Sequence, residues 1–284
     1  MAVAVVLAAC VLATHAARAH DFWIEPSTFH PLPGANIAVG LRVGQDFVGD
    51  PVPRSSRAIA QFIVRQSGTD APIIGIEHID PAGFFRADGQ STAVIAYRSL
   101  PSNVELPADR FEEYLRLEGL ERIIDLRAER GASAKGGRER FSRYAKTLLT
   151  GEQTSAAATQ PIGLAYEIVP DEDPTVRSSV FRGRVLHDGK PLGGALVVAV
   201  LRSDPSVRLA TRSDTRGAFA FTLPRPGAWL IKSVHMVPAS PFSDVDGVGL
   251  WGSLFSDADW ASLWASLTFE SPQAGLSTDA VSPR

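Results

Sequence analysis

Apolar and polar residues alternate in short runs along most of the chain, a pattern that predicts half-buried β-strands. Turns containing Gly or Pro separate these runs, as expected for antiparallel strands joined by tight connections. The runs cover residues 36–43, 59–64, 92–97, 164–169, 180–186, 195–201, 208–212, 219–223, 229–236 and 266–270. The chain also has 24 Gly and 20 Pro in 284 residues, so we predict a mainly β protein.

Helical periodicity is confined to a small part of the chain. Between residues 107 and 130 the apolar side chains recur every three or four positions, which predicts a short helical segment broken near Gly119. Periodicity does not decide between strand and helix for residues 144–149. We also expect one helical turn, capped by Ser256, within residues 257–264.

Proline and acidic residues divide the chain in two. Residues 170–174 place three carboxylates between two prolines, which disfavours regular structure and is typical of a domain boundary. We therefore predict two β-sandwich domains, over residues 20–170 and 179–270, joined by a linker over residues 171–178. The helical insertion belongs to the first domain, and residues 271–284 form a frayed tail rich in Ser, Pro and Ala.

The amino-terminal segment predicts export. Residues 1–17 are apolar and uncharged, and Ala17-Arg18-Ala19 is a small-x-small cleavage pattern. Cleavage there removes residues 1–19 as a signal peptide and makes His20 the first residue of a periplasmic protein. A second interpretation is a lipoprotein box ending at Cys10, which would be acylated and leave His20 internal. Cys10 is the only cysteine, so the mature chain has no disulfide and no Cys-based metal site.

Composition and motifs exclude several classes of function. The 28 basic and 31 acidic residues nearly balance, which gives no electrostatic case for binding nucleic acid or an anionic membrane. After the signal peptide we expect no transmembrane helix. Common catalytic motifs are missing, including the Gly-x-Ser-x-Gly elbow, a phosphate-binding glycine loop and a His-Glu-x-x-His helix. We therefore expect a protein that is not an enzyme.

Histidines supply the candidate chemistry. The mature chain contains His20, His30, His78, His187 and His235. His187 is interpreted as a solvated turn residue, and His30 and His78 as structural or exposed side chains. His235 differs, because it lies in an otherwise apolar strand over residues 229–236, where a buried imidazole needs a polar partner or a metal.

An amino-terminal His20 offers two nitrogen atoms, its α-amine and its ring, and can chelate a divalent metal ion. Together with one nitrogen of His235 this predicts a three-nitrogen site, suited to Cu(II) or Ni(II). Asp21 and Glu25 are candidate oxygen donors to the same ion, or else a helix cap and a surface salt bridge.

Several segments identify a related family. They are residues 19–26, 143–148, 163–170 and 229–236, and the pair 259–260 with 264–269. Together they resemble the domain-of-unknown-function (DUF) 4198 family, grouped with periplasmic components of nickel and cobalt uptake systems. The resemblance implies two immunoglobulin-like or transthyretin-like sandwiches, the second similar to carboxypeptidase-regulatory folds. It favours a strand over residues 144–149 and carries metal binding over to His20 and His235.

The leading hypothesis is a periplasmic protein that binds a divalent transition metal ion, nickel, cobalt or copper, through His20. It would pass the ion to components of a metal-uptake transporter or buffer it for them. The alternative is a non-catalytic structural or interaction module without a metal. A third interpretation is an oxidative copper enzyme with an amino-terminal histidine brace on a β-sandwich.

Overall fold

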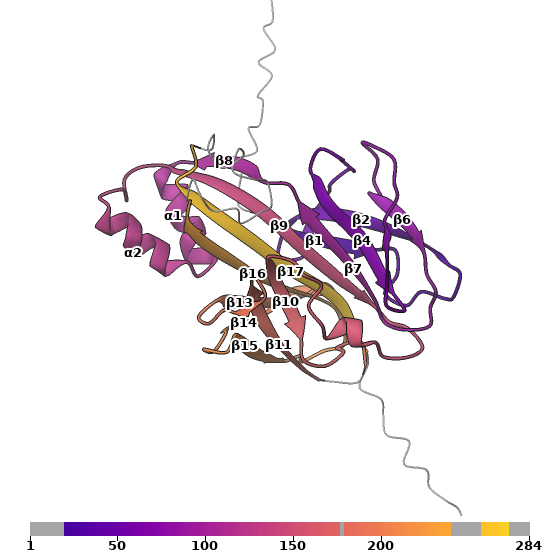
Figure 1. Cartoon of the computed structure of the whole chain (residues 1–284). Coiled ribbons are helices and arrows are strands. Elements are labelled where there is room, and N and C mark those ends of the chain that lie inside the picture. The colour runs from indigo at the N-terminus through magenta and orange to yellow at the C-terminus, as the bar shows by residue number, and fades with distance from the viewer. Residues whose placement is uncertain (1–19, 177–178, 240–256, 273–284) are drawn as a thin grey trace, which may run out of the picture.

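The computed structural model of the chain describes residues 20–176, 179–239 and 257–272. The predicted signal peptide with Cys10, most of the predicted tail, and Ser256 lie outside the described residues. Three β-sheets and two α-helices make up most of the described fold (Figure 1). The prediction of a mainly β protein with sandwich-like packing and a short helical insertion is therefore confirmed.

A nine-stranded central sheet runs through the middle of the molecule (Figure 1). In spatial order its strands are β14 (Asp204–Arg212), β13 (Leu196–Leu201), β16 (Gly227–Pro238), β17 (Trp260–Ser271), β9 (Gly137–Leu149), β7 (Ala93–Ser99), β4 (Ile59–Gln66) and β5 (Thr69–Pro72), with β8 (Ser102–Leu106) also paired to β9. Strands β17 and β9 pair in parallel, and the other neighbours in this sheet are antiparallel.

Two four-stranded sheets cover the central sheet, one on each face. The N-terminal outer sheet contains β1 (Asp21–Pro26), β2 (Asn36–Gln45), β3 (Val48–Pro51) and β6 (Gly83–Arg86). The C-terminal outer sheet contains β10 (Tyr166–Pro170), β11 (Val180–His187), β12 (Lys190–Pro191) and β15 (Ala218–Thr222).

The alternation of side chains along β16 shows how these layers are assembled. Leu230 packs against Trp23 and Phe47 on the side of the N-terminal outer sheet. Trp229 and Ile231 belong instead to the core formed with the C-terminal outer sheet. Because successive side chains of a strand point to opposite faces, β16 contributes to both cores at once. This explains why residues 229–236 are apolar almost throughout, rather than alternating.

The helical insertion packs against one end of the central sheet, over residues of β16 and β17 (Figure 1). Helix α1 (Ala108–Leu117) and helix α2 (Glu121–Glu129) are separated by Gly119, whose φ of +67° suits glycine. The predicted helical segment and its break are thus confirmed. Within the described residues, neither helix is long and apolar enough to cross a membrane.

One local prediction is wrong. Residues 260–264, expected to contribute to a helical turn, are the first residues of β17, where β16 and β9 both pair with them. The buried indoles of Trp260 and Trp264 are four positions apart, a spacing that puts two residues on one face in a helix and in a strand alike. Residues 144–149 belong to β9, as the family resemblance predicted.

The central sheet contains strands from both predicted domains. Strands β4, β5, β7, β8 and β9 come from residues 20–170, and β13, β14, β16 and β17 come from the C-terminal part of the chain. The parallel β17–β9 pair joins the two sets. The division into domains at residues 20–170 and 179–270, with a linker at 171–178, stays a prediction.

Candidate functional site

The two predicted metal ligands lie in different surroundings. Half-buried His20 immediately precedes β1, and the carboxylate of the next residue, Asp21, contacts Lys232 on one face of β16. His235 is three positions beyond Lys232, so its side chain points to the opposite face of the strand. There its ring contacts Tyr166 and His187. The structure therefore brings His235 together with His187 and not with His20.

His187 and His235 form a pair of adjacent imidazoles. Their ring centroids are 4.8 Å apart, and the ring of Tyr166 lies 5.9 Å from that of His235. The Tyr166 hydroxyl is in turn fixed by a 2.7 Å hydrogen bond with the hydroxyl of Ser233. Nε2 of His187 is buried without a hydrogen bond in the structure, and it lies 3.6 Å from Oδ2 of Asp188. The imidazole rings of His187 and His235, which come from separate sheets, thus meet beside the exposed carboxylate of Asp188.

Electrostatics keep one ring of this pair neutral. Burial, together with the smaller effects of the neighbouring His187 and Arg122, lowers the pKa of His235 from 6.5 to about 4. At neutral pH the His235 ring is therefore uncharged, which is the form that binds a metal ion. Among the described residues no three His, Cys, Asp or Glu side chains converge as a metal-binding group. A metal ion here would have two imidazole ligands and complete its coordination with water.

The interpretation of His187 as a solvated turn residue is wrong. The turn is made by Asp188 and Gly189, both with positive φ, while half-buried His187 is still paired within β11. The alternation of Phe181, Gly183 and Val185 on the inward face continues to His187. Extending the alternation of the sequence by two residues, from Val185 to His187, would therefore have placed His187 on the inward face of the strand.

A second cluster contains Lys232 of β16, Asp21 of β1 and Glu118, the residue after α1. Nζ of Lys232 donates to Oδ1 of Asp21 at 2.5 Å and to the two carboxylate oxygens of Glu118 at 3.0 and 3.3 Å. The three side chains are 8%, 3% and 10% exposed. Oδ2 of Asp21 is buried and has no hydrogen-bond partner in the structure. Asp21 is thus part of a buried charge cluster rather than a surface salt bridge.

Burial perturbs the protonation of this cluster. It raises the pKa of Glu118, an effect that the charge of Lys232 opposes and that of Asp21 reinforces. Burial also lowers the pKa of Lys232, but attraction to Asp21 and Glu118 outweighs it and leaves that pKa above its usual value. Sequence reasoning missed the cluster, although a lysine inside an apolar run is itself a signal that a buried partner exists.

Another buried ion pair lies on the opposite face of the central sheet. Nζ of Lys146 in β9 donates to Oε1 of Glu167 in β10 at 2.7 Å, and both side chains are almost fully buried. The Glu167 carboxylate also accepts hydrogen bonds from the backbone N–H groups of Ile162, Gly163 and Leu164 at 2.8 to 3.2 Å. All of its acceptor capacity is engaged, so this pair fastens the loop before β10 to the central sheet.

Glu25, the other predicted oxygen donor, binds arginines. Its Oε2 accepts from Nε of Arg42 at 2.5 Å, and its other oxygen contacts Arg202. Glu25 and Asp21 are therefore both engaged with basic side chains of the protein itself.

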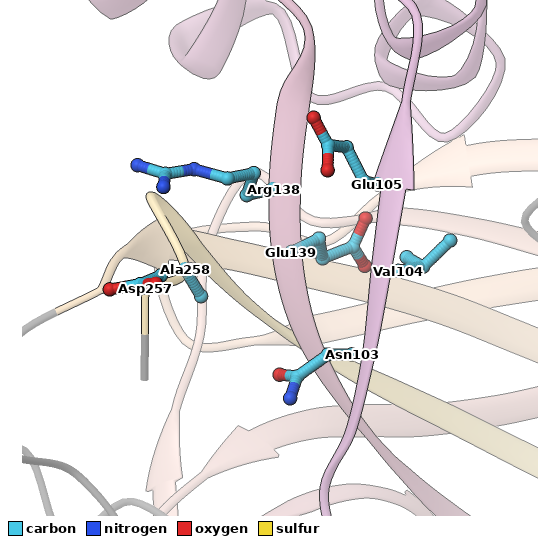
Figure 2. A pocket seen from close by; sticks show the side chains of 7 residues that line it. All are labelled: Asn103, Val104, Glu105, Arg138, Glu139, Asp257 and Ala258. Atoms are coloured by element: carbon cyan, nitrogen blue, oxygen red, sulfur yellow. The ribbon is translucent and has the colours of Figure 1, made fainter. Parts of the chain in front are cut away.

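A pocket of about 320 Å³ lies where β8 and β9 meet the start of β17. Asn103 and Glu105 of β8, Arg138 of β9 and Asp257 line it (Figure 2). The guanidinium of Arg138 is held by two hydrogen bonds to Asp259, at 2.9 and 3.1 Å. The pocket therefore presents a ring of mixed charge, with its one arginine already paired.

Glu139 also lines this pocket, but its carboxylate lies on the other side of β9 from the Arg138 guanidinium (Figure 2). There it accepts hydrogen bonds from the hydroxyls of Tyr114 and Ser262, beneath the helices. Burial raises the pKa of Glu139. This carboxyl group is accordingly held by hydrogen bonds within the core under α1.

Comparison with known proteins identifies the family. A model described as Domain of unknown function (DUF4198) matches residues 17–237. The chain belongs to the DUF4198 family. No curated protein matches this DUF4198 chain.

Two solved structures show a weak likeness to the DUF4198 protein. The D0-D1 domain of Intimin is 11% identical, with 88% of this chain and 97% of that chain covered and a TM-score of 0.20. A tetra-tandem repeat in the extending region of a large adhesion protein is 10% identical, with 89% and 50% covered and a TM-score of 0.20. Scores this low carry no argument about function.

Proposed function

We propose that this DUF4198 protein is exported to the periplasm and binds a divalent transition metal ion at the His187–His235 pair. The observation that carries the proposal is the 4.8 Å separation of the two rings, one of which is kept uncharged by burial. Nickel, cobalt and copper ions all accept imidazole nitrogen. The protein would buffer the ion or deliver it to components of an uptake transporter, without catalysing a reaction.

The surroundings of the pair support binding of a cation that is only partly enclosed by protein. Asp188, beside Nε2 of His187, offers an exposed carboxylate that can approach a bound ion. Arg122 acts in the opposite sense, because its positive charge disfavours a cation near His235. We therefore expect moderate affinity, appropriate to a protein that releases its ion rather than one that holds it permanently.

His20 remains a separate candidate. If export removes residues 1–19, its free α-amine and ring form a second site that does not include His235. Mass spectrometry of the mature amino terminus tests the predicted cleavage, and a chain that begins elsewhere would remove this second site.

Calorimetric titration of the processed protein with Ni(II), Co(II) and Cu(II) tests the proposal. His187→Asn and His235→Asn are each expected to abolish binding at the paired site, whereas His20→Ala is expected to leave it intact. His78→Asn is the matched control, because His78 is exposed and has a φ of +63°, a conformation that asparagine tolerates. Unchanged binding in both His187→Asn and His235→Asn would refute the proposed site.

An interaction module without a metal is the second candidate, and an exposed apolar patch favours it. Ile74 and Ile76 are 65% and 69% exposed, next to Phe84 on the adjoining strand β6. Exposed apolar groups that gather on one surface are typical of protein contacts. Under this alternative, a chelator leaves partner binding unchanged and Ile76→Ser weakens it, whereas the His187→Asn variant behaves as the wild type.

A further inference from the structure

We propose that the side chains of Lys232 and Asp21 condense to an intramolecular amide, an isopeptide bond, with Glu118 as the group that transfers protons. The bond would join β1 to β16, between residues 211 positions apart in the sequence. This inference is independent of the proposed metal site, which lies on the other face of β16.

The geometry already brings the reacting groups together. Nζ of Lys232 lies 2.5 Å from Oδ1 of Asp21, and the second carboxyl group, that of Glu118, is within 3.0 Å of the same nitrogen. The surroundings are apolar, since Val198 pairs with Lys232 across the sheet and Leu230 and Val234 flank it on the same face of β16. Water is largely excluded, which favours loss of water and protects an amide from hydrolysis.

The protons of the cluster suit a condensation. Burial raises the pKa of Glu118, which favours its protonated form, the form that can donate a proton to the carbonyl oxygen of Asp21. Among the described residues, the one other charged group that acts on Glu118 is Arg208, which lowers its pKa. Condensation requires the uncharged amine and the uncharged acid, which form when one proton passes from Lys232 to Asp21. This exchange removes a buried ion pair, and it works against the two carboxyl groups that hold the pKa of Lys232 above its usual value.

The reaction balances without any added reagent. The lone pair of Nζ attacks Cγ of Asp21 and a C–N bond forms, while the carbonyl oxygen takes the proton of Glu118 and Nζ returns one proton to it. The tetrahedral intermediate then loses one hydroxyl group, which Glu118 protonates so that it leaves as water. The remaining hydroxyl gives its proton back to Glu118, and the C=O bond re-forms. An amine and an acid become an amide and water, and Glu118 ends unchanged.

The product would resolve an unsatisfied feature of the unreacted site. Oδ2 of Asp21 is buried without a partner, and condensation removes one of the two carboxylate oxygens as water. The amide N–H that remains keeps the Glu118 carboxyl group, 3.0 Å from Nζ, as its acceptor. Two buried charges also disappear.

The chain provides its own control in the other buried lysine. Lys146 is as deeply buried as Lys232 and lies 2.7 Å from a carboxylate oxygen of Glu167. That carboxylate is saturated by three backbone N–H groups, and among the described residues Glu167 is the one carboxyl group that shifts the pKa of Lys146. With no proton-transfer group and no free oxygen, we expect the Lys146–Glu167 pair to stay ionic.

Mass spectrometry of the full processed chain tests the inference. After folding and then complete denaturation, the wild-type protein is expected to weigh one water molecule less than its sequence. A tryptic digest should contain a branched peptide that joins the segments around Asp21 and Lys232, with no cleavage after Lys232 and normal cleavage after Lys146. A wild-type chain of linear mass, cleaved after Lys232, would overturn the proposal, as would a loss of water that maps elsewhere.

Variants separate chemistry from folding. Asp21→Ala and Glu118→Gln are both expected to have the full linear mass, and Glu118→Gln preserves the shape of the site while removing its acid. Circular dichroism identifies which variants fold. If folded Glu118→Gln forms the amide at the wild-type rate, Glu118 is not the proton-transfer group. The mass of the wild-type chain decides the existence of the bond even if every variant misfolds.

Discussion

The buried Lys146–Glu167 pair makes an asymmetric prediction about stability. Glu167→Leu leaves the Lys146 ammonium buried without a counter-charge and leaves three backbone N–H groups, those of residues 162–164, without their acceptor. Breaking a buried pair in this way costs about 3–5 kcal/mol. Each orphaned N–H adds about 1–3 kcal/mol unless water reaches it. We therefore expect Glu167→Leu to lower the free energy of unfolding by about 4 kcal/mol or more.

Lys146→Met should cost less. The Glu167 carboxylate keeps its three backbone donors, which stabilise the charge, and the methionine stem fills the space of the lysine. The loss is then one hydrogen bond to a charged group, about 1.5–3 kcal/mol. The double variant should be no less stable than Glu167→Leu alone, because the unpaired ammonium is gone.

Urea unfolding followed by tryptophan fluorescence measures these differences, since Trp229 is fully buried in the same core. Glu167→Gln is the conservative control, because it retains an acceptor oxygen for the loop. The reasoning fails if Lys146→Met is as destabilising as Glu167→Leu, or more so, because the backbone donors would then contribute nothing.

Three further predictions follow from local geometry. The pKa of His235 is lowered from 6.5 to about 4, so the folded state binds fewer protons than the unfolded state in this range. Up to about 3 kcal/mol of stability is present above pH 6.5 and is lost as the pH falls towards 4. The His235→Asn variant should flatten that part of the curve of stability against pH. Gly119→Ala should lower the thermal midpoint at a cost of about 1–3 kcal/mol, because φ is +67° and a Cβ atom would lie 2.7 Å from that of Leu196; an unchanged midpoint would contradict the described helix break. Tyr166→Phe removes the 2.7 Å hydrogen bond to Ser233 and should cost about 1 kcal/mol in denaturant unfolding, while a stabilised variant would show that this bond is not formed.

Local pattern was enough to predict most strands and both helices. Alternation located β2, β4, β7 and β11, and the change of period located the helices on either side of Gly119. The one wrong turn, at residues 260–264, had a spacing that suits a helix and a strand equally. What decided it was pairing with β9, a strand 121 positions earlier, and no local window contains that information.

For the candidate sites, too, the local sequence indicates individual residues but not the distant residues that they contact. The sequence indicated that His235 lies in an apolar strand and needs a polar partner, and the same signal at Lys232 was missed. It did not identify those partners, because Asp21 and Glu118 lie 211 and 114 positions from Lys232. For His187 the information was local, since the inward alternation along β11 reaches it. The prediction that His20 and His235 share a site required knowledge of which face each occupies, and only the folded arrangement of β1 against β16 supplies it.

The parallel pairing of β17 with β9 has a consequence for the order in which the protein folds. β9 lies in the middle of the central sheet. It pairs with β7, β8 and β17, and β17 is the last strand that the structure describes. Until that late segment arrives, the earlier part of the chain exposes a long, apolar, unpaired strand edge, a surface prone to association. We therefore expect the chain to complete its fold only after β17 has been made, and a version truncated before residue 260 to aggregate rather than persist as a smaller stable protein.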